Sequence, residues 1–261
     1  MKFLNNKRNL VISFLVFAVI LSSALFFYLK LKKPPQTEEK SSNFSWIFGS
    51  PSPLSSPSNA ASPSPKPKPT PSPLGIGPVH RNVRATVFWV GEGATSDNEY
   101  ISNTVSAWDR NWQENYGGVD NPDSRDGYHP SGFEPKQNPF YFALPYNDLK
   151  GDKSRKENSK SIPWYSATSA EGVSIVKNRW IQVSTEEKTC YAQWEDVGPG
   201  ETDDFDYVFG NASPKNSRYG IDLSPAVRDC LDVGGLSTVW WQFIDNKNVP
   251  AGPWKEIVTG N

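Results

Sequence analysis

The sequence predicts a mostly β fold, a small β-barrel carried on the C-terminal part of the chain. Apolar and polar residues alternate with a period of two in several short stretches, which is typical of half-buried strands. Only one helix has clear start and stop signals, and the stretches between the predicted strands are rich in Gly, Pro, Asn and Asp. Many short strands with few helices favour a barrel over an α/β sheet.

The alternation predicts five strands with two distinct faces. Ile181 and Val183 share one face of their strand, and the polar triplet Glu-Glu-Lys that follows predicts a hairpin to the next strand. Trp194 and Trp241 fall on apolar faces and are expected in the core. The predicted strands are residues 85–92, 139–145, 179–185, 189–196 and 238–245.

One short helix is predicted after Ser224. Ser224 is a good N-cap, Pro225 suits the first helical position, and two glycines at 234–235 provide a stop. A second helix is compatible with residues 102–118. The turn-rich stretches 119–138 and 146–178 are expected to be long insertions between strands.

An apolar segment near the N-terminus predicts membrane attachment. Residues 10–28 are nineteen residues with only serines as polar interruptions, and a spanning helix needs roughly 20 apolar residues. Lysines flank the segment on both sides, so charge does not settle its orientation. Ser22 and Ala24 suit a signal-peptide cleavage site, but the apolar run continues past them. We therefore expect residues 1–33 to be an uncleaved signal-anchor rather than a cleaved signal.

A Pro/Ser-rich linker separates this segment from the predicted domain. Residues 34–78 carry too little apolar surface to pack, and their prolines favour an extended, disordered chain. At about 3.1 Å per residue, such a linker holds a domain on the order of 100 Å from a membrane. The domain, residues 79–261, is accordingly expected on the extracytoplasmic side of a cell envelope. The formal charge of −1 gives no reason to expect a nucleic-acid partner.

The two cysteines, Cys190 and Cys230, predict a disulfide. Two cysteines allow one intramolecular pairing, and an exported domain can keep it oxidised, although two free buried thiols are the alternative. A cysteine metal site is not expected, because the chain has only two histidines. Asp203, Asp204 and Asp206 lie in an acidic loop without the spacing of an EF-hand, so we expect a solvated loop, and neither a metal nor a cofactor.

Three short motifs, in order, carry a resemblance to a known family. They are "FALPYND" at 142–148, "CYAQWEDVGPG" at 190–200 and "GIDLSPAVRDCL" at 220–231. Together they resemble the double-psi β-barrel of the rare lipoprotein A and expansin superfamily, over roughly residues 83–250. The resemblance implies a six-stranded double-psi barrel with one short helix after the second psi-loop. Each motif is short, so their order and spacing speak for the fold more than for an activity.

The resemblance implies a polysaccharide of the cell wall as ligand. Similar proteins include lytic transglycosylases, small inverting endoglucanases, expansins that bind or loosen wall glycan, and barwin-like and inhibitor proteins. Fold alone does not select among them. The favoured expectation is a monomeric, membrane-tethered, expansin-like wall-binding module. The alternatives are a peptidoglycan-cleaving enzyme and a protein-binding inhibitor or adhesin on the same barrel.

Asp222 and Asp196 are the candidate catalytic residues. Asp222 matches the general acid of the catalytic relatives, and cleavage of a glycosidic bond needs a carboxylic acid with a raised pKa. The nearby helix N-terminus would lower the pKa of Asp222, whereas Asp196 would raise one pKa of the pair if the two turns meet. The alternative is structural: both carboxylates accept backbone N–H bonds that fix the two loops.

Two further positions of the catalytic relatives are unmatched. The base that inverting endoglucanases carry on the first strand would fall near Val90, with Glu92 two residues on. The histidine of catalytic lipoprotein A relatives has no counterpart, because His80 precedes the expected barrel and His129 lies in an insertion. A lytic route needs a single acid, since the sugar's own hydroxyl is the nucleophile.

Four aromatic residues are candidates for binding sugar through its apolar C–H faces. Trp180 and Trp240 are expected to face away from the core, where the alternative role is packing beneath the insertions. Trp164 and Tyr165 are loop aromatics expected at the edge of a groove.

Overall fold

The computed structural model describes residues 72–216 and 218–260. All of them belong to the second of two units into which the chain divides, Pro63–Asn261. The predicted signal-anchor and most of the predicted linker lie outside the described residues. Within the described ranges, no helix is long and apolar enough to cross a bilayer.

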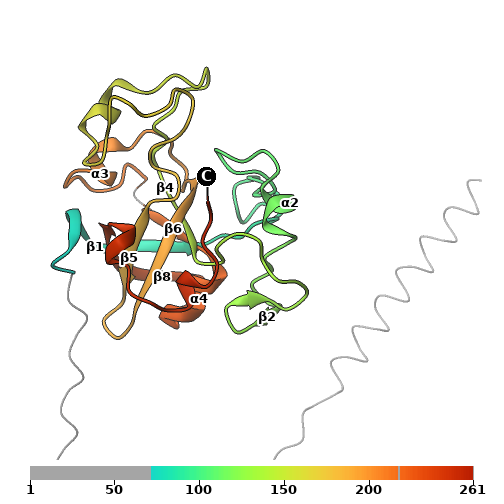
Figure 1. Cartoon of the computed structure of the whole chain (residues 1–261). Coiled ribbons are helices and arrows are strands. Elements are labelled where there is room, and N and C mark those ends of the chain that lie inside the picture. The colour runs from blue at the N-terminus through green and yellow to red at the C-terminus, as the bar shows by residue number, and fades with distance from the viewer. Residues whose placement is uncertain (1–71, 217, 261) are drawn as a thin grey trace, which may run out of the picture. The chain divides into compact units, whose positions relative to one another are not determined.

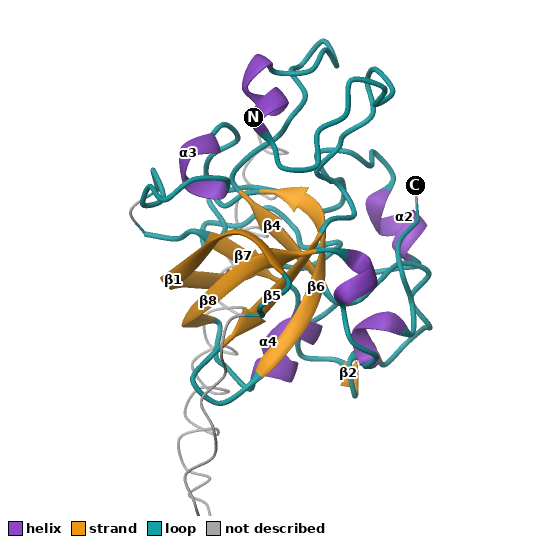
Figure 2. Ribbon diagram, turned by 60° about the vertical axis from the view of Figure 1, so that its left-hand side comes forward, coloured by secondary structure: helices purple, strands orange, loops and turns teal. Residues whose placement is uncertain are grey.

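Six strands close into a barrel in the order β1-β7-β4-β6-β5-β8 (Figures 1 and 2). The pairs β1–β7 and β4–β6 are parallel, whereas the other four pairs of the barrel are antiparallel. A separate two-stranded sheet, β2–β3, lies in the segment between β1 and β4. The barrel strands are β1 (Gly75–Val87), β4 (Tyr141–Leu144), β5 (Trp180–Ser184), β6 (Thr189–Val197), β7 (Ile221–Leu223) and β8 (Leu236–Ile244), and the outer pair is β2 (Arg125–Asp126) and β3 (His129–Pro130).

The mostly β prediction is confirmed, with two corrections to the strands. Each of the five predicted strands overlaps an observed one, but β7 was missed because three residues are too few to show a period of two. Strand β1 begins at Gly75 instead of residue 85, within the predicted linker. Irregularities in its pairing with β8, between Ile76 and His80 and between His80 and Val83, interrupt the alternation that would have revealed it.

His80 therefore lies in the barrel rather than before it. Its ring stacks on Trp241 with centroids 3.9 Å apart and meets the edge of Tyr207 at 5.1 Å. Burial lowers the pKa of His80 to about 4, so the buried ring is neutral.

The predicted helix after Ser224 is confirmed as α4 (Pro225–Leu231). The Ser224 hydroxyl accepts a bond from Val227 N at 3.3 Å and donates one to Pro139 O at 2.7 Å, which joins the helix start to the segment before β4. The helix ends at Asp232, in the left-handed conformation, rather than at the two glycines. The other helical segments are short: α2 (Trp112–Tyr116), α3 (Phe205–Val208), η1 (Glu157–Ser161), η2 (Asn246–Asn248) and η3 (Pro253–Lys255).

Aromatic side chains fill the barrel. Trp194 and Trp241 are fully buried there, as predicted, and pack with Phe142 and Phe243. Burial of such large side chains is the main favourable contribution to folding. The disulfide between Cys190 and Cys230, also predicted, joins β6 to α4.

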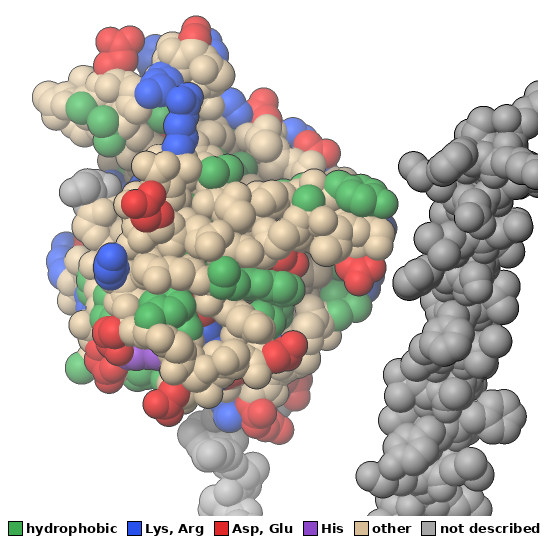
Figure 3. All heavy atoms as spheres, turned by 90° about the vertical axis from the view of Figure 1, so that its right-hand side faces the viewer, with side chains coloured by type: hydrophobic (Ala, Val, Ile, Leu, Met, Phe, Trp, Pro, Cys, Tyr) green, Lys and Arg blue, Asp and Glu red, His purple; other side chains and the backbone are tan. Residues whose placement is uncertain are grey.

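The two long connections pack against different parts of the barrel, and the one between β4 and β5 contributes Ile175 and Val176 to the main core. The segment between β1 and β4 covers the outer face of β4 through a second apolar cluster, Phe88, Val90, Trp112, Tyr116, Tyr141 and Ala143. The segment between β4 and β5 is fixed by the buried Asp148, which pairs with Arg155 and accepts a bond from Ile175 N at 2.9 Å. Seen from the side of α2, the surface carries separate apolar patches with acidic side chains around them (Figure 3).

Candidate acid site

Asp222 and Asp196 occupy one row across four neighbouring strands. Asp222 on β7 pairs with Thr86 on β1 and with Ala143 on β4. Ala143 in turn pairs with Asp196 on β6. Neighbouring strands are about 4.8 Å apart, so the Cα atoms of the two aspartates are separated by about 10 Å. The two motifs that the sequence singled out therefore meet on either side of Ala143.

A β-bulge in β6 places Asp196 in this row. Phe142 pairs with Trp194, but the next residue of β4, Ala143, pairs with Asp196, so Glu195 is the extra residue. Trp194 faces the barrel core, whereas Ala143 belongs to the outer cluster. With strict alternation Asp196 would share the face of Trp194, and the bulge brings it to the face of Ala143 instead.

Asp222 is partly exposed and is held by two neighbours. The Thr86 hydroxyl donates a hydrogen bond to Asp222 Oδ1. On the other side, a Cβ added to Gly198 would lie 3.3 Å from Asp222 Oδ2. The Gly-Pro turn after β6 thus lies directly against the carboxyl of Asp222, and the absence of a side chain at Gly198 allows this approach.

Asp196 is more deeply buried, at 8% exposure, and is anchored to the main chain. Its Oδ1 accepts bonds from Ala107 N and Val197 N, each at 2.8 Å. The first of these bonds ties the β1–β4 segment to the barrel. Part of the structural role considered for Asp196 is therefore present.

Burial raises the pKa of both carboxyls to about 7. The charge of Asp222 adds to the effect on Asp196, which agrees with the like-charge repulsion expected from the sequence. The helix N-terminus alone would lower the pKa of Asp222. The pKa is raised instead, because desolvation is the largest effect on this carboxyl. Two coupled carboxyls of this kind titrate as a pair.

The hydrogen bonds favour a single proton on Asp222 near neutral pH. Two backbone N–H donors stabilise the charged form of Asp196 and lower its pKa. Among the described residues, Asp222 has only one donor, the Thr86 hydroxyl, which also lowers its pKa but can rotate to accept a bond from a protonated carboxyl. The arrangement therefore provides a neutral, partly exposed carboxylic acid beside a fixed carboxylate.

Two further acidic residues surround the pair. Glu92 is 8% exposed, accepts a bond from Asn103 Nδ2 at 2.7 Å, and its charge raises the pKa of Asp222. Glu195, the bulge residue, is 2% exposed, and burial raises its pKa to about 8. Lys177 Nζ lies 4.0 Å from Glu195 Oε2. Val90, at the position expected for a base, is a buried residue of the outer cluster, so Glu92 is the acidic residue of this segment that reaches the site.

The two outward-facing tryptophans have different surroundings. Trp180 faces away from the core but is 2% exposed, because the C-terminal segment packs over it with Val249 and Trp254. Lys255 Nζ lies 4.7 Å from the centre of its ring. Trp180 thus takes the packing role considered for it. Trp240, in β8, is partly exposed and pairs with Ser184 of β5.

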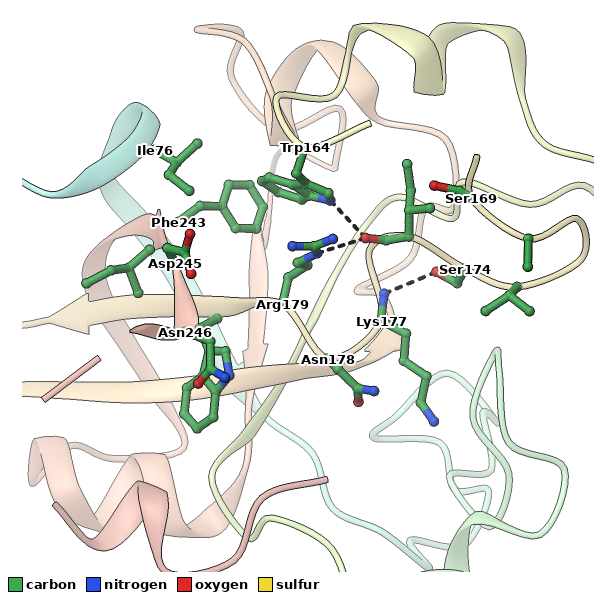
Figure 4. A pocket seen from close by; sticks show the side chains of 15 residues that line it. Ile76, Trp164, Ser169, Ser174, Lys177, Asn178, Arg179, Phe243, Asp245 and Asn246 are labelled. Atoms are coloured by element: carbon green, nitrogen blue, oxygen red, sulfur yellow. Dashed lines mark hydrogen bonds between the residues drawn. The ribbon is translucent and has the colours of Figure 1, made fainter. Parts of the chain in front are cut away.

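The two loop aromatics, Trp164 and Tyr165, also have different surroundings. Trp164 lines a cavity of about 450 Å³ (Figure 4). Tyr165 packs against the barrel core. Trp108 was missed: it follows Ala107, whose N–H binds Asp196, and its indole N–H donates to Asn147 Oδ1 at 3.1 Å. No period-two or motif signal distinguished it from the other aromatics of the segment.

The acidic loop after the Gly-Pro turn is not simply solvated. Asp204 is 1% exposed and accepts a bond from Lys215 N at 2.7 Å, while Asp203 forms an ion pair with Lys156 at 2.9 Å. These contacts secure the loop to two other segments. His129, in β3, pairs with Glu134 at 3.3 Å.

Comparisons with known proteins do not identify a function for this chain. No family model matches the chain, and no curated protein matches it. Among solved structures, the chain is similar to Streptomyces papain inhibitor, with 15% sequence identity and a TM-score of 0.27. The match covers 65% of this chain and 97% of that one. A likeness at this level supports no argument about activity or partners.

Proposed function

We propose that this barrel is a double-psi β-barrel that cleaves cell-wall polysaccharide by a lytic route, with Asp222 as the general acid. Two parallel strand pairs within an otherwise antiparallel six-stranded barrel support this fold assignment, together with the three motifs of the resemblance. The observation that carries the proposed activity is the pairing of Asp222 and Asp196 across Ala143 in a desolvated site.

The chemistry needs one proton and no activated water. Protonated Asp222 donates its proton to the glycosidic oxygen as the bond between that oxygen and the anomeric carbon breaks. A hydroxyl of the same sugar attacks the anomeric carbon and closes an anhydro ring. The hydroxyl proton passes to the carboxylate pair, which ends the reaction with one proton as it began. The Thr86 hydroxyl stabilises Asp222 while it is charged.

The N-terminal part of the chain would deliver this site to its substrate. In this proposal residues 10–28 anchor the chain in a membrane, and residues 34–78 extend toward the wall. The barrel acts there as a monomer. The disulfide between Cys190 and Cys230 agrees with an oxidising compartment.

A second candidate function is wall binding without cleavage, as in an expansin-like module. The partly exposed, outward-facing ring of Trp240 favours it, because such a ring can cover the apolar face of a sugar. In that case Asp196 and Asp222 serve to join the β1–β4 segment and the Gly-Pro turn to the barrel.

Incubation with isolated wall separates the two candidates. The full-length protein, in mild detergent, is incubated with peptidoglycan, peptide-stripped glycan strands and cellulose. Pelleted protein is quantified, and soluble fragments are identified by mass spectrometry. We expect fragments with anhydro ends from wild type and a loss of at least about 100-fold with Asp222→Asn. Asp206→Asn, on the exposed side of α3, is the matched control and should release fragments as wild type does.

Each other result has a defined meaning. Sedimentation of wild type with wall and no soluble fragments would exclude cleavage and support the binding module, with Trp240→Ala as its next test. Neither binding nor release would refute both glycan functions and direct attention to a protein partner.

A further inference from the structure

A second site-like feature is the cavity at the start of β5 and the end of β8 (Figure 4). Its volume of about 450 Å³ suits a small molecule or one unit of a polymer. Polar side chains at its border include Arg179, Asp245 and Ser169. Its apolar wall is formed by Ile76, Trp164, Val173, Trp180, Phe243 and Ile244.

Arg179 is held in place from one side. Its Nε donates to the Ile175 carbonyl at 3.0 Å, and the indole N–H of Trp164 donates to the same oxygen at 2.8 Å. The guanidinium carbon lies 5.0 Å from the centre of the Trp164 ring, a cation–π arrangement. Trp164 is fixed in turn by the edge of Phe243, with ring centroids 5.0 Å apart. The guanidinium plane is therefore set before any ligand arrives.

The other edge of the guanidinium is unused. Within the described parts of the chain, neither Nη1 nor Nη2 of Arg179 makes a hydrogen bond or an ion pair. Asp245 lies near enough for its charge to act on Arg179, but it instead accepts a bond from Lys247 N at 3.2 Å. Arginine presents its N–H groups as a rigid fork that matches the two oxygens of a carboxylate.

We propose that this cavity binds a carboxylate, which Arg179 holds through both terminal amino groups. A carboxylate fits better than phosphate, because Asp245 borders the same cavity and would repel a dianion more strongly. The apolar wall provides contacts for the carbon skeleton that carries the carboxylate.

The cavity adjoins the acid site through one residue. Lys177 lines the cavity, and its amine points away from Arg179 (Figure 4). Its Nζ lies 4.0 Å from Glu195, the neighbour of Asp196 in β6. A polymer unit in the cavity would thus lie one side chain away from the end of β6, which carries Asp196. Resting on the proposed function, we assign the carboxylate to the wall polymer, either to its peptide side chains or to its acidic sugar.

Binding measurements test this assignment without cleavage. Full-length Asp222→Asn protein in detergent is titrated by calorimetry with three probes: muropeptides with intact peptide stems, peptide-stripped fragments that keep the sugar carboxylate, and neutral chitin oligomers. We expect muropeptides, stripped fragments or both to bind at least 10-fold more tightly than the neutral oligomers. Binding of the stripped fragments alone assigns the sugar carboxylate, because an intact peptide stem holds that group as an amide. Binding of the muropeptides alone assigns the peptide stem, and binding of both shows that Arg179 accepts either carboxylate.

Variants then identify the group responsible. In the same background, Arg179→Gln should weaken binding of the carboxylate probe at least 10-fold. Arg179→Lys, which keeps the charge but not the fork, should also weaken it severalfold. Arg81→Gln is the matched control, because Arg81 is an exposed arginine of β1 away from the cavity. It should leave binding unchanged.

Other outcomes overturn the proposal. Equal affinity for neutral and carboxylate probes, no binding of any probe, or unchanged binding after Arg179→Gln would each contradict it, as would stronger competition by inorganic phosphate than by acetate. The cleavage assay remains an independent readout. If anhydro ends are released but binding does not depend on Arg179, only the carboxylate subsite is refuted. If binding depends on Arg179 but no fragments are released, only the proposed cleavage is refuted.

Discussion

Replacement of Asp222 by Asn should stabilise the protein above neutral pH while it removes the proposed acid. An aspartate of the unfolded chain loses its proton near pH 3.8, whereas Asp222 in the barrel keeps its proton to about pH 7. Between these values the folded state binds more protons than the unfolded state. The free energy of unfolding therefore falls as the pH rises through this window, and the loss is complete above pH 7.

The size of the effect follows from the shift. A difference of about three pKa units corresponds to about 4 kcal/mol, at roughly 1.4 kcal/mol per unit. Asp222 is partly exposed, so solvent screens part of this energy, and we expect about 2 to 4 kcal/mol. Asparagine does not titrate and can still accept a bond from the Thr86 hydroxyl. The stability difference should thus be near zero at about pH 4 and should favour Asp222→Asn by about 2 to 4 kcal/mol at pH 8.

Urea unfolding of residues 63–261, followed by tryptophan fluorescence from pH 4 to pH 8, measures this difference. Asp206→Asn serves as the control for loss of a surface carboxylate. A stability difference that does not change with pH, or a variant less stable than wild type at pH 8, would refute the assignment of a buried, protonated Asp222.

Three other predictions concern the neighbours of this site and the barrel. Glu92→Gln should move the alkaline limb of the pH–activity profile to lower pH, because the charge of Glu92 raises the pKa of Asp222; an unmoved limb would contradict the coupling. Reduction of the disulfide between Cys190 and Cys230 should lower the free energy of unfolding by about 4 kcal/mol, from the 40-residue separation of the cysteines, as measured by urea titration with and without reductant. Relative to His80→Phe, the wild type should lose about 3 kcal/mol of stability as the pH drops from about 6.5 to about 4, because the unfolded chain protonates a histidine that the barrel keeps neutral. The carboxyls of the acid site change stability in the opposite direction over this range, but they are the same in both proteins. Urea titrations of both proteins measure this difference, and a difference that does not change between these pH values would contradict a neutral, buried His80.

Local patterns predicted those elements that depend on near neighbours in the chain. The N-cap at Ser224 and the strands on either side of the Glu-Glu-Lys turn follow from short-range rules, and the structure confirms them. The same rules placed Trp180 and Trp240 alike, on the outer face of their strands. The difference between them comes from the C-terminal segment, which packs over Trp180 and leaves Trp240 partly exposed. The period-two pattern of a strand depends on its own residues, so it cannot predict that a distant C-terminal segment covers one of these side chains.

Residue types and their local order were enough to nominate Asp196 and Asp222, to expect a barrel and to pair the two cysteines. The chemistry of the aspartates depends on contacts that the sequence does not display. The bulge at Glu195 turns Asp196 to the face of Ala143, and strand β7 is too short to be recognised before its partners are known. Desolvation then raises both pKa values, since burial is a sum over atoms from distant parts of the chain. Composition and spacing could supply the acids, but strand register and burial determine which of them keeps a proton.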